Sequence, residues 1–360
     1  MKVVSIFGTR PEMIKMWSTL KKLDSLNFEH IMVHTGQNYT PELKDFFFRD
    51  LELRKPDFEL QINTSSYGEE VADVIRKSDE LFSRIKPDAL LILGDTYSGL
   101  SIMPATHQGI KTFHMEAGLR AWDIRMPEQR NRMLIDHMSS ILLPFNQYHR
   151  ENLMRENIHP SKIFVTGNPT YEVMRHFLPN VKDCDVLKRM GLDERSYVLV
   201  TAHRSENVDK SETLSKIIFA LGEIVKKYKR EVIYPMHPRT KSKLAGIEIP
   251  KGVRIIDPLG FYDFNKLLSD AWCILSDSGT ASEEALFYKV PCVNLRMTTE
   301  RPETVEAGGN IIAGLNADNI IDSVETAVTQ EWGCRYDLNE NFTASSVVIN
   351  AIRSDITNFF

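Results

Sequence analysis

Acidic and basic side chains that could move a proton beside an anion gather between residues 114 and 132. The stretch is HMEAGLRAWDIRMPEQRNR and follows a β-like run, KTF. Carboxylates crowded together push at least one pKa upward, which lets one site hold an acid and a base. Guanidinium groups bind phosphate or carboxylate oxygens. A solvated salt-bridge surface is the alternative for the same residues, which include Glu116, Glu128, Arg120, Arg125, Arg130 and Arg132.

A further carboxylate, Asp95, ends the apolar run LLIL within GDTYS. It is either a turn residue that caps the next helix or a base in a partly desolvated cleft. With Glu116 and Glu128 it would complete a trio of carboxylates. No GxSxG motif and no cysteine beside a polar strand end is present, so acid–base chemistry is favoured over covalent catalysis.

Several motifs have the chemistry of a phosphate site. In SDSGTASEEALF, Ser278, Gly279 and Thr280 are expected at a helix start, where free backbone amides suit a phosphate. Glu283 and Glu284 are expected in the first turn, where a carboxylate would accept hydrogen bonds from a ribose diol. A well-capped helix with an acidic first turn is the alternative.

Two His/Arg pairs and one basic turn add to this phosphate chemistry. His203 precedes Arg204 after the run VLV, and His237 lies two residues before Arg239 after VIY. Both residue types bind phosphate. In GTRPEMIK, Arg10 would contact a diphosphate, and Lys15 lies a turn and a half further along the expected helix. No GxGxxG motif occurs, so no tightly bound dinucleotide is expected.

The elements that must position these motifs alternate between short apolar strands and helices. Parallel sheets covered on both faces are typical of this pattern, and two such series predict two doubly wound domains with a hinge near 165–174. Seven polar clusters each follow an expected strand, and ligands of open α/β sheets bind at that edge. The expected strands are VVSIF, HIMVHT, DALLILGD, KTFH, ILLPF, KIFVTG, SYVLVTA, EVIYPM, VRIID, AWCILSD and VPCVNL.

The composition is that of an ordinary globular protein. The 360 residues are 42% hydrophobic and 26% charged, with a net charge of −5, which argues against nucleic-acid and polybasic membrane partners. No zinc-ligand spacing occurs, no segment approaches a membrane span, and the first apolar run is too short for a signal peptide. A cytoplasmic protein is expected, with its four scattered cysteines reduced.

The motifs GTRPE, LGD, HMEAGLR, PE…NR, VTGN, HR.EN, SDSG..EEA and TTERPE occur in the order found in one family. Over roughly residues 1–310 the chain resembles the non-hydrolysing UDP-N-acetylglucosamine 2-epimerases. The resemblance implies the GT-B architecture, in which two Rossmann-like domains hold a nucleotide sugar between them. It implies domain limits of 1–167 with 344–360, and 168–343, and a homodimer.

The resemblance also implies a mechanism. A carboxylate removes the proton at carbon 2 while UDP leaves carbon 1, and UDP then adds back to the glycal with protonation on the opposite face. No cofactor and no metal are needed, and the product serves surface polysaccharide synthesis. The implied catalytic residues are Asp95, Glu116, Glu128 and His203. The residues expected at UDP are Arg10, Lys15, Arg204, His237, Ser278, Gly279, Thr280, Glu284 and Arg301.

Two departures from the family pattern bear on the substrate. The segment AWDIRM is short, and relatives with a short loop there act on modified UDP-hexosamines, including 6-deoxy and 3-acetamido-uronate sugars. The segment after Gln37 lacks the histidine-bearing sequence that helps bind an activating second substrate molecule. Alternatives for the chain are a hydrolysing 2-epimerase, a GT-B glycosyltransferase and a non-catalytic UDP-sugar sensor.

The carboxylate assignment predicts that Asp95→Asn and Glu116→Gln abolish turnover while UDP still binds, because each replacement removes a proton acceptor and leaves the phosphate contacts in place. Activity assays and UDP titration calorimetry measure the two effects separately. Full activity in both variants would remove these residues from the acid–base role.

Overall fold

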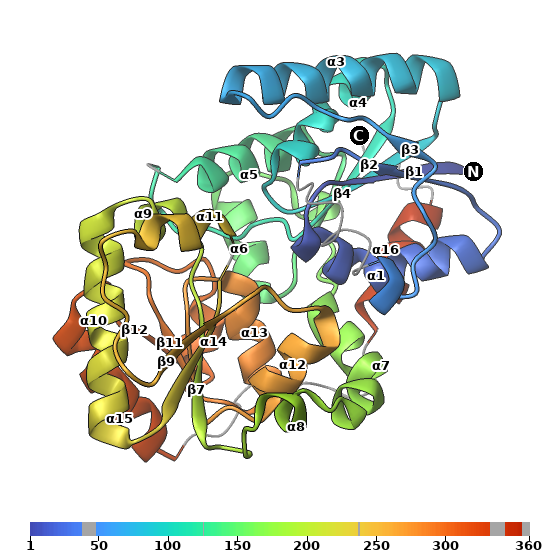
Figure 1. Cartoon of the computed structure of the whole chain (residues 1–360). Helices are drawn as coiled ribbons and strands as arrows, with labels where there is room; N and C mark the ends of the chain where they lie inside the picture. The colour runs from blue at the N-terminus through green and yellow to red at the C-terminus, as the bar shows by residue number, and fades with distance from the viewer. Residues whose placement is uncertain (38–47, 125, 237, 332–342, 355–360) are drawn as a thin grey trace. The chain divides into compact units, whose positions relative to one another are not determined.

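The protein is described by a computed structural model that covers residues 1–37, 48–124, 126–236, 238–331 and 343–354 of the chain. The chain forms two compact units, Met1–Val173 with Glu340–Phe360, and Met174–Asn339. Each unit is built around one parallel sheet (Figure 1). Among the described residues, none of the helices is long and apolar enough to cross a membrane.

The first unit has a six-stranded sheet in the order β3-β2-β1-β4-β5-β6. The chain starts in the middle of the sheet, runs to one edge and then returns to build the other half. This reversal between β1 and β4 creates the switch point at which α/β sheets bind ligands. The strands are β1 Lys2–Phe7, β2 Glu29–His34, β3 Phe58–Glu59, β4 Ala89–Leu93, β5 Lys111–Met115 and β6 Ile141–Leu143.

Helices cover both faces of this sheet, because its central strands are apolar on both sides. β4 is buried at every position, and Val4, Ile6 and Leu90 pack in one cluster with residues of α3 and α4. The helices are α1 Arg10–Ser25, α3 Tyr67–Ile85, α4 Ile102–His107, α5 Pro127–Met138, α6 Gln147–Arg155 and α16 Ala344–Arg353, with 3₁₀ turns η1 Tyr97–Ser101 and η2 Pro160–Lys162. Helix α7 Pro169–Asp183 begins in the first unit and continues into the second, which starts at Met174.

The C-terminal helix α16 belongs to the first unit. Lys22 of α1 donates a hydrogen bond to Ser346 Oγ at 2.6 Å, and the Ser345 backbone amide and hydroxyl both donate to the Glu172 carboxylate at 3.0 and 2.6 Å. The Lys22 contact joins α16 to α1, and the Ser345 contacts join it to Glu172 in the first turn of α7.

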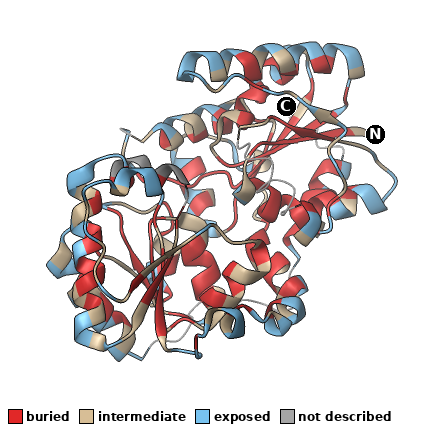
Figure 2. Cartoon of the chain, viewed as in Figure 1, coloured by how far each residue is buried: buried red, intermediate tan, exposed pale blue. Residues whose placement is uncertain are grey.

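The second unit repeats the same strand order, β12-β11-β10-β7-β8-β9. Alternate residues of β7 face opposite clusters, since Val198 and Val200 pack with α10 and α15 whereas Tyr197 and Leu199 pack with α12 and α13. Figure 2 shows the central strands of both sheets buried and the outer faces of α3 and α10 exposed. The strands are β7 Tyr197–Thr201, β8 Glu231–Pro235, β9 Val253–Ile256, β10 Cys273–Ser276, β11 Cys292–Asn294 and β12 Asn310–Ile312.

Helices and short turns connect the strands of the second unit, and α10 is the longest of these helices among the described residues. The helices are α8 Val186–Met190, α9 Ser205–Val208, α10 Ser211–Tyr228, α11 Pro238–Lys241, α12 Phe261–Ser269, α13 Gly279–Tyr288, α14 Pro302–Glu306 and α15 Ala317–Thr329, with the 3₁₀ turn η3 Ser242–Leu244.

The structure confirms the two doubly wound parallel sheets. One of the predicted strands is wrong, and two strands were not predicted. KIFVTG is not a strand of the sheet: Phe164 and Thr166 donate backbone bonds to residues of the β6 region, but only Ile163 forms a bridge, with Leu142. The edge strands β3 and β12 were not predicted from the sequence. Each has only two or three residues, too few for a periodic pattern.

Gly8 follows β1 where no side chain fits. A Cβ atom there would collide with the Thr35 hydroxyl and lie 2.5 Å from Ser98 Oγ, two hydroxyls that hydrogen-bond each other at 2.9 Å. We expect Gly8→Ala to lower the free energy of unfolding by ~1–3 kcal/mol, measured by urea denaturation, because the collision overpacks the turn. Gly68→Ala in α3 is the control. Its Cβ meets nothing within 4 Å, so it should be neutral or stabilise by ~0.5–1 kcal/mol. A Gly8→Ala variant as stable as the control would contradict the packing argument.

Candidate active site

The loops after β4 and β5 bring two of the predicted carboxylates together at the carboxyl edge of the first sheet. Arg132, in the second turn of α5, donates to Asp95 Oδ2 and lies 3.4 Å from Glu116 Oε1. Its guanidinium is 2% exposed. One buried cation therefore holds two carboxylates that would otherwise repel each other. Asn131 of the same helix donates to the Asp95 carbonyl at 3.1 Å.

Glu116 is fixed from a second side by Lys15 of α1. The Lys15 ammonium lies 2.6 Å from Glu116 Oε2, and both side chains are almost fully buried. Lys15 was predicted to contact UDP, and the structure places it on this carboxylate. The backbone of Glu116 has φ +64°, an uncommon conformation for a residue with a side chain, of the kind that clusters at active sites. Arg132 also donates to the Glu116 carbonyl at 3.2 Å.

Glu12 was not predicted from the sequence, although it lies at the same edge. Its Oε2 atom accepts from the backbone amides of Gly8 and Thr9 at 3.0 and 2.8 Å and from the Thr9 hydroxyl at 2.7 Å. Its Oε1 atom accepts from the Thr96 hydroxyl at 2.7 Å. The loop after β1 is thereby tied to the loop that carries Asp95. The signal was present as Thr9 followed three residues later by Glu12, the spacing of a capping box.

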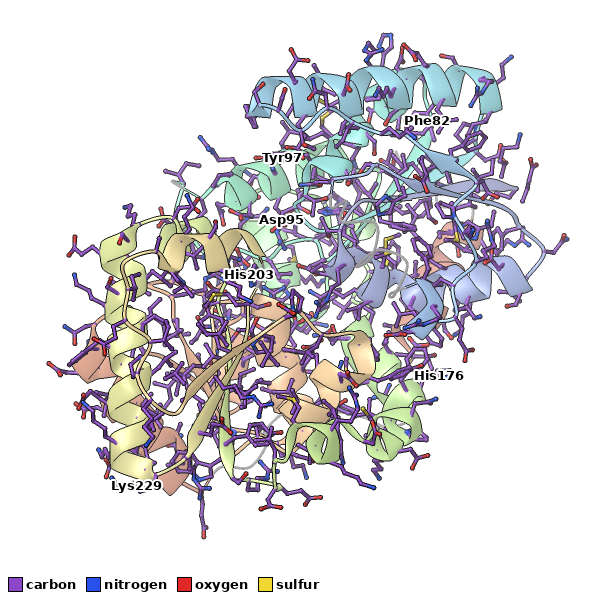
Figure 3. The ribbon with its side chains drawn as sticks, in the orientation of Figure 1. Phe82, Asp95, Tyr97, His176, His203 and Lys229 are labelled. Carbon is purple, nitrogen blue, oxygen red and sulfur yellow. The ribbon has the colours of Figure 1, made fainter. Side chains whose placement is uncertain are left out.

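Glu128 and Arg10 are each half-buried in the first turn of a helix, Glu128 in α5 and Arg10 in α1. Burial raises the pKa of Tyr97, and the charges of Glu70 and Glu128 add to the rise. Helix α5, whose first turn carries Glu128, packs against the 3₁₀ turn that follows Asp95. Asp95 and Tyr97 are labelled in Figure 3.

In the second unit, a buried aspartate organises the His203–Arg204 loop. Asp277, which follows β10, accepts from the His203 amide at 3.1 and 3.0 Å, the Arg204 amide at 2.9 Å and Asn207 Nδ2 at 2.9 Å. The His203 ring stays 57% exposed (Figure 3). Asp277 was not predicted, because only the register between β7 and β10 brings its carboxylate to this loop.

The start of α13 has the expected cap. Ser278 accepts from the Ala281 amide at 3.4 Å, and Gly279 and Thr280 open the helix. The prediction that Glu283 and Glu284 occupy the first turn was wrong. The helix begins at Gly279, which places both residues, each buried, in the second turn.

Arg301 packs against the start of α13. Its guanidinium is buried and donates to Glu283 Oε1 at 2.8 Å and Glu300 Oε2 at 3.0 Å. A Cβ atom at Gly279 would collide with that guanidinium. Arg301 was predicted to contact UDP, and these contacts place it against the backbone of the capped turn.

The remaining prediction, His237, lies outside the described residues, so the second His/Arg pair has no structural account. In the part of the chain that the structure describes, no three His, Cys, Asp or Glu side chains are grouped so as to hold a metal ion. Cys184, Cys273 and Cys292 are free thiols.

Two parallel sheets of identical strand order, each with ionisable residues at its carboxyl edge, define an α/β protein of the GT-B class with two Rossmann-like units. The chain belongs to the UDP-N-acetylglucosamine 2-epimerase family, whose model matches residues 21–345.

Similar proteins support this membership over nearly the whole chain. The chain is 38% identical to UDP-N-acetylglucosamine 2-epimerase of Methanococcus maripaludis, covering 90% of this chain and 91% of that protein. It is 32% identical to UDP-2,3-diacetamido-2,3-dideoxy-D-glucuronate 2-epimerase of Pseudomonas aeruginosa, covering 91% and 92%. The crystal structure of the Methanocaldococcus jannaschii UDP-GlcNAc 2-epimerase with UDP-GlcNAc and UDP is similar with a TM-score of 0.92, at 35% identity and covering 98% and 99%.

Glu12 should make stability depend on pH. Burial raises its pKa from 4.5 to about 7 against the opposing effect of its hydrogen bonds. The folded chain then holds a proton that the unfolded chain has lost between pH 4.5 and 7, so the free energy of unfolding falls as pH rises through this window.

Glu12→Gln removes this proton. We therefore expect the difference in free energy of unfolding, variant minus wild type, to rise between pH 4.5 and 7.5 by up to about 3 kcal/mol, at roughly 1.4 kcal/mol per pKa unit. Urea denaturation over that range measures it, with Glu69→Gln on the exposed face of α3 as the control. A difference that stays constant with pH would refute the shift.

Proposed function

We propose that the chain inverts carbon 2 of a UDP-N-acetylhexosamine by eliminating UDP and adding it back. The contact of Arg132 with both Asp95 and Glu116 carries this proposal. Two carboxylates held at one sheet edge can serve opposite faces of a sugar carbon, because one accepts a proton while the other donates one.

In the forward step, a carboxylate takes the proton from carbon 2 and the electron pair of that bond forms a double bond to carbon 1. The bond between carbon 1 and the UDP oxygen breaks, and its electron pair leaves with UDP. In the return step, the UDP oxygen bonds to carbon 1 and the acid delivers a proton to the other face of carbon 2. No net oxidation occurs, so the balance needs no redox partner. We assign the proton transfers to Asp95, Glu116 and Glu128, with Lys15 and Arg132 holding Glu116 and Asp95 in position.

UDP must be held while it is detached from the sugar, and we assign this role to the capped turn of α13 and to the basic loops. The backbone amides of Gly279 and Thr280, after the capping residue Ser278, present the positive end of a helix to a diphosphate. In this assignment Arg301 positions Gly279 and does not itself contact UDP. Further contacts to UDP are assigned to Arg10, Arg204, His237 and Glu284, and His203 is assigned a catalytic role.

The substrate we propose is UDP-N-acetylglucosamine. Two relatives, which are 38% and 37% identical to the chain, are named UDP-N-acetylglucosamine 2-epimerase. A diacetamido-uronate sugar is the second candidate, because the loop between Leu119 and Met126 is short and the relative from Pseudomonas aeruginosa bears that name. The domain limits of 1–167 with 344–360 and 168–343, a homodimer and a role in surface polysaccharide synthesis belong to the same proposal.

Incubation with UDP-N-acetylglucosamine in deuterated water should place deuterium at carbon 2 of both epimers, because the abstracted proton exchanges with solvent before it returns. Proton NMR follows the exchange, and the 6-deoxy and 3-acetamido-uronate sugars serve as parallel substrates. UDP that accumulates together with free sugar would indicate the hydrolysing reaction instead. No exchange with any of the sugars would leave a glycosyltransferase or a binding protein.

A further inference from the structure

Beneath the carboxylates lies a second group of ionisable side chains that the proposed reaction does not use. It consists of His114 on β5, Arg120 after it, Asp136 on α5 and Glu156 after α6, here called the buried charge cluster. His114 Nδ1 lies 2.8 Å from Asp136 Oδ1, and Arg120 lies 2.7 Å from Asp136 Oδ2 and from both oxygens of Glu156. The side chains of His114, Arg120 and Asp136 are 0% exposed.

The hydrogen bonds of His114 determine its protonation. Its Nδ1 atom faces the Asp136 carboxylate, and its Nε2 atom lies 2.8 Å from the Gly94 carbonyl oxygen. A carbonyl oxygen only accepts, and an ionised carboxylate also only accepts. Both ring nitrogens must therefore donate, and a histidine that donates from both nitrogens is an imidazolium cation.

The state of Asp136 agrees with this assignment. Its burial favours the neutral acid, but hydrogen bonds and charge from His114 and Arg120 outweigh burial and lower its pKa. Its Oδ2 atom also accepts from the Gly118 amide at 3.2 Å. With His114 protonated, the cluster holds two cations and two anions, the balance that a buried group of charges requires.

Two members of the buried charge cluster hydrogen-bond to the backbone of the loops that carry Asp95 and Glu116, here called the carboxylate loops. His114 holds the carbonyl of Gly94, the residue before Asp95, and Asp136 holds the amide of Gly118, two residues after Glu116. Asp136 lies one helical turn after Arg132 on α5. On α5, Arg132 thus contacts the two carboxylate side chains. Asp136, on the same face of the helix, contacts the backbone of one loop directly and that of the other through His114.

We propose that His114 is a positioning residue, held as an imidazolium by Asp136, that sets the separation of Asp95 and Glu116. Its role in catalysis rests on the proposed epimerisation, whereas its protonation rests on the hydrogen bonds alone. The charged groups that face it are Asp136 directly, Arg120 and Glu156 through Asp136, and Asp95 beyond Gly94.

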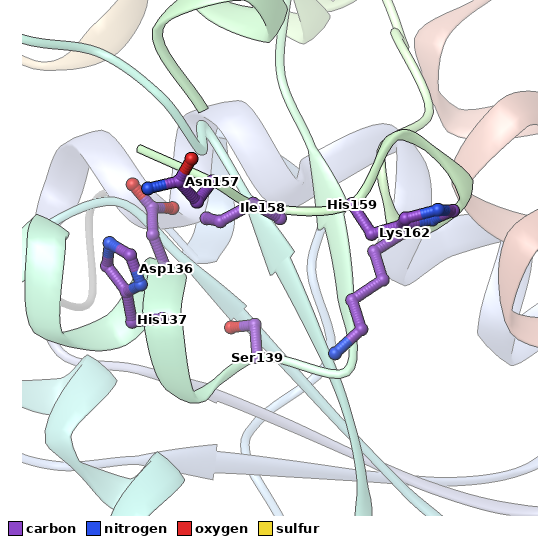
Figure 4. A pocket seen from close by; sticks show the side chains of 7 residues that line it. All are labelled: Asp136, His137, Ser139, Asn157, Ile158, His159 and Lys162. Atoms are coloured by element: carbon purple, nitrogen blue, oxygen red, sulfur yellow. The ribbon is translucent and has the colours of Figure 1, made fainter. Parts of the chain in front are cut away.

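His137, in the last turn of α5, provides a matched control variant. Asp136 borders a pocket of about 410 Å³ whose other lining residues include His137, Asn157 and Lys162 (Figure 4). His137 lies next to Asp136 in the chain and contacts Glu156 at 3.2 Å, but its side chain is 48% exposed and it reaches neither carboxylate loop. His137→Gln therefore alters a histidine beside the cluster without removing the contact to Gly94.

The first test is ¹⁵N NMR of the wild-type chain labelled at histidine nitrogens, with His114 assigned by its absence in His114→Gln. We expect protons on both ring nitrogens at pH 7.5. A neutral ring, with one bare nitrogen, would overturn the assignment. This measurement needs no activity, so it decides on the cluster even if the chain shows no exchange at carbon 2, a result that would overturn the proposed function instead.

The second test compares the kinetics of His114→Gln and His137→Gln. Since a small misplacement of reacting groups costs on the order of 100-fold in rate, we expect kcat of His114→Gln to fall about 10- to 100-fold, with KM for the UDP-sugar changed less than about twofold. His137→Gln should keep wild-type kcat. An unchanged kcat in His114→Gln, or an equal loss in both variants, would overturn the positioning role. If His114→Gln fails to fold, His114→Asn replaces it both in the assignment of the NMR signals and in the kinetic comparison.

Discussion

The contact between Arg132 and two carboxylates is the constraint around which the first unit is arranged. Asp95 and Glu116 come from adjacent strands, and strand pairing alone would leave two negative charges facing each other at the sheet edge. A guanidinium offers donors in two directions and stays charged at any physiological pH, so it can satisfy both carboxylates at once. Lys15 then occupies the remaining oxygen of Glu116. Lys15, Glu116 and Arg132 are buried, and the geometry of the group must therefore be supplied by the fold rather than by solvent.

The surrounding structure meets this demand with a second layer of polar contacts. Glu12 ties the turn after β1 to Thr96, and the buried charge cluster ties Gly94 and Gly118 to α5. In the second unit, Asp277 does the same for the His203 loop. In each of these cases buried charged side chains hold backbone amides or carbonyls. Arg301 differs, since it pairs with the carboxylates of Glu283 and Glu300 beside the start of α13. Both units thus solve the problem of irregular loops at a sheet edge in the same way.

The sequence alone was sufficient for the residues that follow strands directly. Asp95, Glu116 and Ser278 were placed by local pattern, because an apolar run that ends in a polar cluster marks the carboxyl edge of a parallel sheet. It was not sufficient for Asp277, Asp136 or the pairing of Lys15 with Glu116. Those contacts join residues far apart in the chain, and they depend on strand register and on which helix face packs inward. The start of α13 was predicted correctly, and the error lay in assigning Glu283 and Glu284 to its first turn, because they are the fifth and sixth residues of the helix.

The spacing of Arg132 and Asp136 on α5 has a consequence for how this chain can vary. An α-helix turns by about 100° per residue, so one inserted or deleted residue between Pro127 and Asp136 would turn one of the two side chains away from its loop. Changes in length are tolerable only before Pro127, in the segment that starts at Leu119. That segment contains Trp122 and Ile124, which are 60% and 63% exposed in the first unit. Evolution can therefore lengthen or shorten this loop while the contacts of Arg132 and Asp136 stay unchanged.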